Sequence, residues 1–272
     1  MRKANGWQLK GNAPEAYEQY MVPAFTKTWA EDLVGRAEPK KGEHMLDAAC
    51  GTGIVARSAA LCQGADARIT GSDINEVMLD KAREIGREMG ISVEWRQGDI
   101  MALPFSDATF DLVLCQQGLQ YFSDKEMALK EMRRVLVPGG RILASVWRSM
   151  KYFPFYTVLH EALGRYVGSE AADILSSAFT LGDARELKAL FGSAGFGEIR
   201  VDLVIRQMRH PSLEAFVIGG MAASPFAPDF FGLDDETREE MLRHIETSMS
   251  DYMDDSGLAA PMEVYVLSAL NQ

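Results

Sequence analysis

The stretch that most constrains this fold runs from Met45 to Val55 and reads Met-Leu-Asp-Ala-Ala-Cys-Gly-Thr-Gly-Ile-Val. Its first residues are mostly apolar and predict a short buried strand. Gly51 and Gly53 then allow the backbone to turn tightly with no Cβ in the way. From Ile54 a helix is expected, and the N–H groups at a helix start favour polar or anionic ligand groups. The stretch therefore predicts a pocket of the nucleotide-binding type.

The bulk composition favours one core domain with added elements, because 272 residues with 47% apolar side chains can fill a sizeable core. No window approaches about 18 uninterrupted apolar residues, and the opening residues Met1 to Trp7 lack the apolar run of a signal peptide. Cys50, Cys62 and Cys115 form no CxxC pair, which argues against a disulfide framework and a cysteine-built zinc site. We expect a cytoplasmic protein with no membrane span.

The charge balance bears on the partners. The formal net charge is −11, and its most acidic part, between Asp229 and Asp255, is interpreted as a solvated helix face. Binding a phosphate backbone needs clustered Lys and Arg. The composition therefore disfavours nucleic acid and leaves a small molecule as the expected partner, with the oligomeric state open.

From residue 42 onward, short β-rich runs alternate with predicted helices. The expected strands are residues 44–49, 68–72, 92–97, 110–115 and 140–147, and the helices between them are 53–63, 75–89 and 124–135. This alternation implies parallel strands with right-handed crossovers, hence an open α/β sheet with helices on both faces. A helix at 183–194, a strand at 196–208 and a closing strand at 263–270 are expected later.

Two stretches interrupt this alternation and are interpreted as a helical lid over the binding edge of the sheet. The predicted organisation is an N-terminal helical arm (1–40), a cofactor-binding core (41–149), a lid insertion (150–180), more core (181–210), a second lid insertion (211–260) and a closing strand (261–272). The lid aromatics either line a pocket for an apolar acceptor or form the lid's own core.

Ligands in open α/β sheets bind outside the carboxyl ends of the strands. That rule selects the residues that follow each predicted strand, namely Asp47 to Gly53, Asp73, Asp99 and Gln116. Carboxylates therefore dominate the expected site, which suits a zwitterionic ligand without phosphate better than a pyrophosphate.

Three motifs occur in order: the run Leu46 to Gly53, the segment Ala102-Leu-Pro-Phe-Ser-Asp-Ala-Thr-Phe-Asp-Leu-Val, and Glu131-Met-Arg-Arg-Val-Leu-Val-Pro-Gly-Gly. Together with Gly71-Ser-Asp73 and Gly98-Asp99 they resemble the class I S-adenosylmethionine-dependent methyltransferases, more closely the small-molecule branch that includes the ubiquinone and menaquinone C-methylases. The resemblance covers residues 42–147 well. It implies a Rossmann-like, seven-stranded, mostly parallel sheet with an antiparallel closing strand, and S-adenosylmethionine as the methyl donor.

The resemblance assigns the cofactor site. Asp73 is expected to accept from both ribose hydroxyls and Asp99 from the adenine amino group, while Asp47 helps to orient the methionine part. Ala49 stands where the family has its first glycine. The full expected set is Asp47, Ala49, Gly51, Thr52, Gly53, Asp73, Ile74, Gly98, Asp99, Ile100 and Gln116.

Several alternatives stay open. Gly51 to Ala56 with Asp73 about 20 residues on also fits the dinucleotide pattern of NAD(P)-dependent oxidoreductases, and a non-catalytic protein that only binds S-adenosylmethionine is a second rival. Asp73 and Asp99 could cap helices, and a register shift of one would exchange Gln116 for Gln117.

The expected reaction is in-line transfer of a methyl group to a small, partly apolar metabolite. Alignment and exclusion of water supply much of such catalysis, and a hydroxyl acceptor would gain from a base. The candidates are His160, Tyr20 and Tyr121, with Tyr17 beside them on the arm. No histidine has a metal partner at suitable spacing, so no metal is expected. The sequence leaves open whether carbon, oxygen or nitrogen is methylated.

Overall fold

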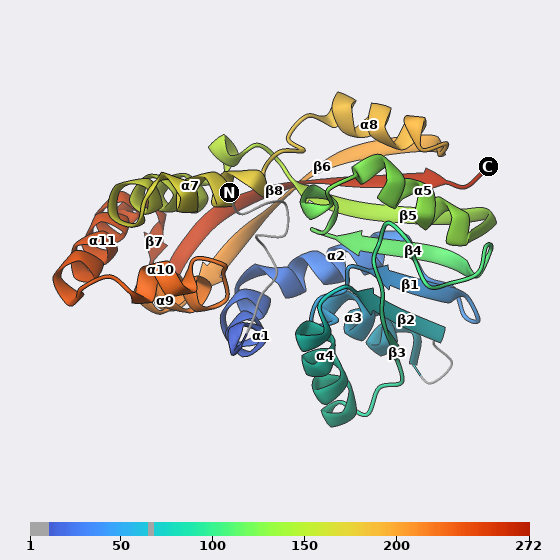
Figure 1. Cartoon of the computed structure of the whole chain (residues 1–272), viewed down its shortest axis with the longest axis horizontal. Helices are drawn as coiled ribbons and strands as arrows, with labels where there is room; N and C mark the ends of the chain where they lie inside the picture. Colours follow the sequence, from blue (N-terminus) through green and yellow to red (C-terminus); the bar gives the residue numbers. More distant parts are fainter. Residues whose placement is uncertain (1–10, 65–67) are drawn as a thin grey trace.

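The computed structural model describes residues 11–64 and 68–272. Its central element is an eight-stranded sheet, counted over the residues described, in the order β3-β2-β1-β4-β5-β8-β6, with β7 paired to β8 (Figure 1). The strands are β1 (His44–Ala48), β2 (Arg68–Asp73), β3 (Glu94–Gln97), β4 (Phe110–Gln116), β5 (Leu136–Trp147), β6 (Gly197–His210), β7 (Met253–Asp254) and β8 (Gly257–Leu270).

The inner strands β1 to β5 are parallel, whereas β8 runs antiparallel to both β5 and β6. This confirms the predicted architecture, including its antiparallel closing strand. That strand begins several residues earlier than expected, and β7, a two-residue strand that pairs with its start, was not predicted.

Both faces of the central strands β1, β4 and β5 are buried, as is usual for parallel strands, whereas the edge strands β3 and β6 are largely exposed. On β1, Met45 belongs to one apolar cluster and its neighbour Leu46 to the other, because successive side chains on a strand point to opposite faces. Helices α2 (Lys27–Ala37) and α3 (Ile54–Gln63) contribute to the first cluster, and α5 (Lys125–Val135) and α8 (Ala184–Ser193) to the second. Helix α4 (Glu76–Glu88) packs against β2 and β3.

The described N-terminal part is one continuous helical run from Ala13 to Ala37. It comprises α1 (Ala13–Ala16), the π-helix η1 (Tyr17–Thr26) and α2. Two contacts attach this arm to the core: Arg57 of α3 donates to both carboxylate oxygens of Glu18 at 2.9 Å, and Gln116 Nε2 donates to the carbonyl of Thr26 at 3.0 Å. A π-helix is rare and is found mostly at functional sites.

Two helical segments leave the sheet after β5 and β6. The first contains η4 (Met150–Tyr152), α6 (Pro154–Ala162), η5 (Leu163–Val167) and α7 (Ser169–Ser177), and the second contains α9 (Leu213–Ala222), α10 (Ala227–Phe231), α11 (Asp235–Ser248) and η6 (Ser250–Tyr252). They lie beside the extended ends of β6 and β8 (Figure 1).

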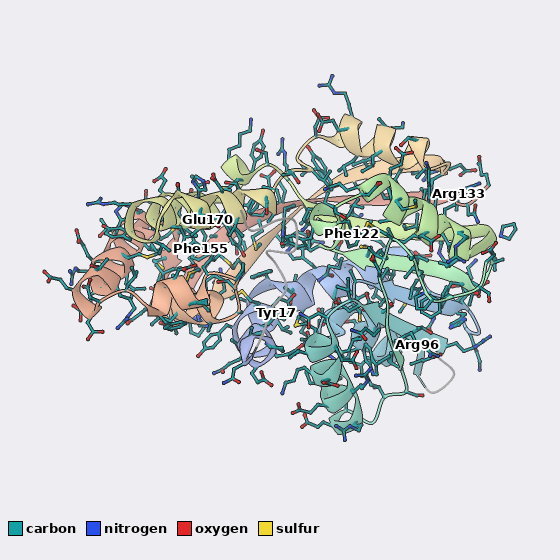
Figure 2. All side chains as sticks on the ribbon, in the orientation of Figure 1. Tyr17, Arg96, Phe122, Arg133, Phe155 and Glu170 are labelled. Atoms are coloured by element: carbon teal, nitrogen blue, oxygen red, sulfur yellow. The ribbon has the colours of Figure 1, made fainter. Side chains whose placement is uncertain are left out.

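These segments share one core with the arm. The Phe25 ring lies 5.9 Å from the ring of Trp147 and 6.4 Å from that of Phe216, and Phe155 lies 5.0 Å from Phe216. Figure 2 shows Tyr17 on the arm and Phe155 on the first helical segment. Among the described helices, none is long and apolar enough to cross a bilayer.

Candidate active site

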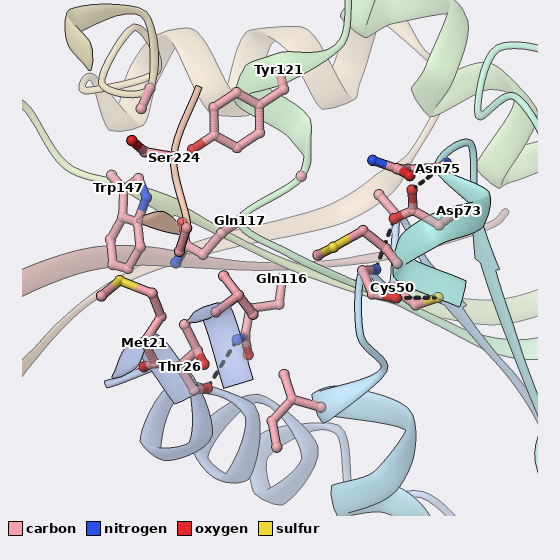
Figure 3. A pocket seen from close by; sticks show the side chains of 18 of the residues that line it. Met21, Thr26, Cys50, Asp73, Asn75, Gln116, Gln117, Tyr121, Trp147 and Ser224 are labelled. Atoms are coloured by element: carbon pink, nitrogen blue, oxygen red, sulfur yellow. Dashed lines mark hydrogen bonds between the residues drawn. The ribbon is translucent and has the colours of Figure 1, made fainter. Parts of the chain in front are cut away.

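A cavity of about 370 Å³ lies at the carboxyl ends of β1, β2 and β4, and the arm and both helical segments contribute to its wall. Figure 3 shows its two ends, with Asp73, Asn75 and Cys50 on one side and Tyr121, Trp147 and Ser224 on the other. The three predicted carboxylates, Asp47, Asp73 and Asp99, all line it. The strand-end rule therefore selected residues that the fold does bring together.

Asp73, at the end of β2, holds the glycine loop in place. Its Oδ2 accepts from the N–H of Gly51 at 2.8 Å, and its Oδ1 accepts from the N–H of Asn75 at 2.9 Å. The cap of α4 is Asn75, whose side chain accepts from Val77, so Asp73 is not the helix cap that the sequence left open. Burial raises the pKa of Asp73, against three backbone hydrogen bonds, from Asn75, Gly51 and Ile74, that lower it. A carboxylate oxygen has a second lone pair, so Asp73 can still accept from a ligand hydroxyl.

Asp47, at the end of β1, is only 1% exposed and lies beneath the same loop. Its Oδ2 accepts from the N–H of Ala56 in the first turn of α3 at 2.9 Å. Burial raises the pKa of Asp47 to about 7, and the Asp73 carboxyl adds to the rise. A buried carboxyl poised at this pKa suits a ligand cation that would return it to the charged form.

Asp99, after β3, is fixed by a short turn in which its Oδ1 accepts from the N–H of Met101 at 2.9 Å. Gly98, Ile74 and Ile100 also line this end of the cavity. Ile74 is 49% exposed and so offers an apolar face to a ligand. The residues expected to hold the adenine ring thus lie together at the ends of β2 and β3.

Two residues that line the cavity adopt the left-handed backbone conformation that favours glycine. Ala49 has φ 55°, and Gln117 has φ 52°. The family glycine that Ala49 replaces would relieve this strain, which costs on the order of 1 kcal/mol. Strained backbone of this kind concentrates at functional sites, and here it occurs after both β1 and β4.

Thr52 and Gly53 of the predicted set are not among the residues that line the cavity. A Cβ on Gly53 would lie 2.3 Å from Cη2 of Trp95, and one on Gly71 would lie 2.5 Å from Cε3 of the same ring. Trp95, on β3, therefore packs against the back of the loop. The structure gives Gly53 a different role from close approach to the ligand, because the glycine leaves room for an indole.

The other end of the cavity is largely aromatic and apolar. Of the lid aromatics singled out in the sequence, Phe155, Phe179, Phe216 and Phe226 line the cavity, while Phe153 and Phe230 are buried elsewhere and Phe231 is exposed. Both interpretations of these residues, pocket lining and lid core, therefore apply to different members. Among the described residues that line the cavity there is no Lys, Arg, His or Glu.

Gln116 and Gln117 both line the cavity after β4. The amide Nε2 of Gln116 is used by the Thr26 carbonyl, whereas its buried Oε1 has no hydrogen-bond partner among the described residues. The buried Oγ of Ser72, which also lines the cavity, likewise has no hydrogen-bond partner among the described residues. Buried polar atoms without partners are costly, so both are explained if a ligand supplies the missing groups.

The catalytic candidates are divided by the structure. Tyr121 lines the cavity, and so does Tyr17. Tyr20 instead packs against Gly219 of α9 and lies 6.2 Å, ring to ring, from His210. His160 is also on α6, but Phe155, Tyr156 and Leu159 of that helix line the cavity and His160 does not. Neither Tyr20 nor His160 is therefore placed to contact an acceptor there.

Sequence reasoning missed Tyr156, Ser224, Trp147 and Trp95. Tyr156 lies on α6, and the sequence does not show how that helix is rotated about its axis. Within residues 11–64 and 68–272, no group of three or more His, Cys, Asp or Glu side chains could hold a metal ion.

Comparison with known proteins agrees with this geometry. The family described as "Methyltransferase domain" matches residues 45–140. The demethylmenaquinone methyltransferase of Staphylococcus carnosus is 34% identical over 185 residues, which cover 64% of this chain and 76% of that protein. Its counterpart from Staphylococcus haemolyticus is 33% identical over 185 residues, covering 64% and 77%.

Solved structures show the same fold. The YcgJ protein from Bacillus subtilis superposes with a TM-score of 0.61 at 16% identity, covering 89% of this chain and 98% of that one. A Haemonchus contortus phosphoethanolamine N-methyltransferase solved with S-adenosyl-L-methionine gives a TM-score of 0.60 at 19% identity, covering 94% and 56%. With the sequence relatives and the carboxylate-lined cavity, the conclusion is that this chain belongs to the class I S-adenosylmethionine-dependent methyltransferases.

Proposed function

We propose that this enzyme methylates a small, largely apolar acceptor that carries a ring but no phosphate or carboxylate, and that the acceptor binds between the arm and the two helical segments. The observation that carries the proposal is the split character of the cavity, with carboxylates at one end and aromatic side chains at the other. A cation would have to neutralise a phosphate or carboxylate on the acceptor, and the described lining offers none.

The residues present suit S-adenosylmethionine, which supplies an electrophilic methyl group on a sulfonium. Asp73 would hold the ribose, Asp99 the adenine amino group and Asp47 the methionine ammonium. Ile74 and Ile100 would flank the ring, with Gly51 and Ala49 at the methionine part. Ser72 Oγ and Gln116 Oε1, buried without partners among the described residues, offer two further groups for the ligand pair.

The aromatic end supports a flat apolar acceptor. Phe155, Phe179 and Phe216 bring ring faces and edges to the cavity, and such contacts each contribute about 0.5–1.5 kcal/mol beyond area burial. The Staphylococcus relatives are named for demethylmenaquinone. We infer an acceptor of that general character for this chain, with the carbon, oxygen or nitrogen identity of the methylated atom still to be measured.

The arm (1–40) and the segments 150–180 and 211–260 are proposed to act as a lid that excludes water. Their contribution to the cavity wall supports this, since removing water strengthens electrostatic interactions and leaves alignment as a main source of catalysis.

A cytoplasmic location and a partnership with small molecules rather than nucleic acid complete the proposal. They are supported by three cysteines that are free of disulfides and by a net charge of −11.

The same carboxylates argue against the alternative hypothesis of an NAD(P)-dependent oxidoreductase. A negatively charged pyrophosphate placed at the glycine loop would face the carboxyl groups of Asp47 and Asp73. The test is a thermal shift with S-adenosylhomocysteine and with NAD, followed by an acceptor screen that measures S-adenosylhomocysteine release. Stabilisation by NAD alone would reject the cofactor assignment. Tight binding of S-adenosylhomocysteine with no turnover of any neutral ring acceptor would favour the non-catalytic alternative.

A further inference from the structure

Three tyrosines from three different elements meet at the acceptor end of the cavity. Tyr17 comes from η1, Tyr121 from η3 (Leu119–Tyr121) and Tyr156 from α6, and all three line the cavity. Figure 3 shows the Tyr121 hydroxyl on the same side of the cavity as Ser224 and Trp147. Convergence of three hydroxyls from separate parts of the chain is not required by the packing of any one helix.

The surroundings of each ring fix its position. The Tyr17 hydroxyl hydrogen-bonds with the side chain of Thr26. Tyr121 interacts with the side chains of Gln120 and Trp147. The Tyr156 ring is held between Phe155 at 5.3 Å and Phe179 at 5.4 Å between ring centres. The hydroxyls are thus preorganised before any acceptor binds.

These hydroxyls stay protonated throughout the neutral range. Burial raises the pKa of Tyr17 to about 12 and the pKa values of Tyr121 and Tyr156 still further above the ordinary phenol value. Tyr17 and Tyr121 each add to the rise at Tyr156, which places the three groups within electrostatic reach of one another. Glu18 raises and Arg57 lowers the pKa of Tyr17 by smaller amounts.

The other ionisable groups of the described lining lie at the cofactor end. Asp47 and Asp73 lie at the ends of β1 and β2, Asp99 lies beyond β3, and all three accept backbone N–H groups there. Burial raises the pKa of the Cys50 thiol well above its usual range. Within the described lining, the acceptor end therefore offers hydroxyl donors, while the carboxyl groups lie at the cofactor end, where Asp47 is near enough for its charge to raise the pKa of Tyr17.

We propose that Tyr17, Tyr121 and Tyr156 together bind an oxygen of the acceptor through their hydroxyls, and that the acceptor reacts as an anion formed by losing its own proton to water. This inference rests on the proposed function. Neutral donors aimed at a developing or existing oxyanion are an effective form of stabilisation in a site that excludes water. The proposed acceptors are therefore ring compounds with an acidic hydroxyl.

The step balances without a further reagent. The acceptor hydroxyl releases one proton to solvent, and the anion's electron pair forms the new bond to the methyl carbon. The carbon–sulfur bond breaks with its pair left on sulfur, so the sulfonium becomes a neutral thioether. If a ring carbon is methylated, that carbon loses its hydrogen as a proton and the oxygen is reprotonated, so one proton is still released for each methyl transferred.

A binding experiment tests the cluster without turnover. The probe is 4-nitrophenol, whose anion absorbs visible light, titrated into the enzyme saturated with S-adenosylhomocysteine. Each of Tyr17→Phe, Tyr121→Phe and Tyr156→Phe is expected to weaken binding of the anion about ten- to a hundredfold, as loss of a hydrogen bond to a charged group does. Tyr20→Phe, on the same helix as Tyr17 but outside the cavity lining, is the matched control and is expected to bind as the wild type does. Anion binding unchanged in all three variants overturns the proposal.

A pH profile tests whether the acceptor loses its proton to water. With two hydroxylated ring acceptors of different acidity, the acidic limb of kcat/KM is expected to shift by the difference between their pKa values. A limb that stays at one pH for both acceptors identifies a protein base and overturns this part. If no acceptor turns over while the probe experiment succeeds, the proposed function fails and the hydroxyl cluster stands as a binding site for an oxygen anion.

Discussion

The contact between Gly53 and Trp95 yields the sharpest prediction for the cofactor loop. In Gly53→Ala the new Cβ would lie 2.3 Å from Cη2 and 2.7 Å from Cζ3 of the indole. The indole cannot move aside freely, because Gly71 packs against another part of the same ring. Overpacking of this kind costs about 1–3 kcal/mol, and the φ of 82° adds about 1 kcal/mol for any residue with a Cβ.

Gly42 offers a matched control. It has φ 85°, and a Cβ built on it meets no atom within 4 Å. Gly42→Ala should therefore cost only the backbone share, about 1 kcal/mol, whereas Gly53→Ala should cost about 2–4 kcal/mol. The free energy of unfolding is measured by urea titration followed by circular dichroism. Calorimetric titration with S-adenosylhomocysteine should show affinity lowered on the order of tenfold to a hundredfold for Gly53→Ala alone, as loop misplacement implies.

A double-mutant cycle identifies the cause. In Trp95→Leu the indole is gone, so adding Gly53→Ala should cost about 1–3 kcal/mol less than it does in the wild type. Gly42→Ala should be additive with Trp95→Leu within about 0.5 kcal/mol. Equal losses from Gly53→Ala and Gly42→Ala in the wild-type background, within the same margin, would refute the argument that the indole forces the glycine.

Four further predictions concern the carboxylates. The pKa of Asp47 is about 7 against 3.8, so the folded protein binds a proton at Asp47 more tightly than the unfolded chain does. The free energy of unfolding should therefore fall by up to about 4 kcal/mol as pH rises from 4 to 7. Asp47→Asn should remove this pH dependence in urea titrations. Affinity for S-adenosylmethionine should rise over the same pH range in the wild type, as the charged form of Asp47 becomes available to the ligand ammonium, and should be nearly flat in Asp47→Asn. Asp73→Ala should lower cofactor affinity at least about a hundredfold with the fold retained by circular dichroism, and unchanged affinity would remove Asp73 from the site. Glu18→Ala leaves Arg57 buried without its carboxylate, so a loss of about 3–5 kcal/mol and faster proteolysis of the arm are expected; resistance equal to the wild type would show that the arm is held by other contacts.

The positions found from sequence are those whose neighbours along the chain determine their place. Asp47 and Asp73 lie at the carboxyl ends of their strands and Asp99 lies just beyond one, so the strand pattern alone put them at one edge of the sheet. Trp95 packs against Gly53 from β3, which lies two positions away from β1 in the sheet. The sequence near either residue does not predict this contact. The acceptor end depends on how helices rotate against each other, which is why Tyr156 was missed and His160 was selected although they lie on the same helix.

The position of β8 has a consequence for how the protein acquires its structure. Trp147 of β5 pairs with Val264, and Val204 of β6 pairs with the same residue. The strand that joins these two halves of the sheet is therefore paired with residues far away in the sequence, a kind of contact that slows folding. The βα units that carry Asp47, Asp73 and Asp99 pair over shorter separations, such as Met45 with Ile69 and Thr70 with Glu94. We therefore expect the methyl-donor end to gain protection from hydrogen exchange earlier in refolding than the acceptor end.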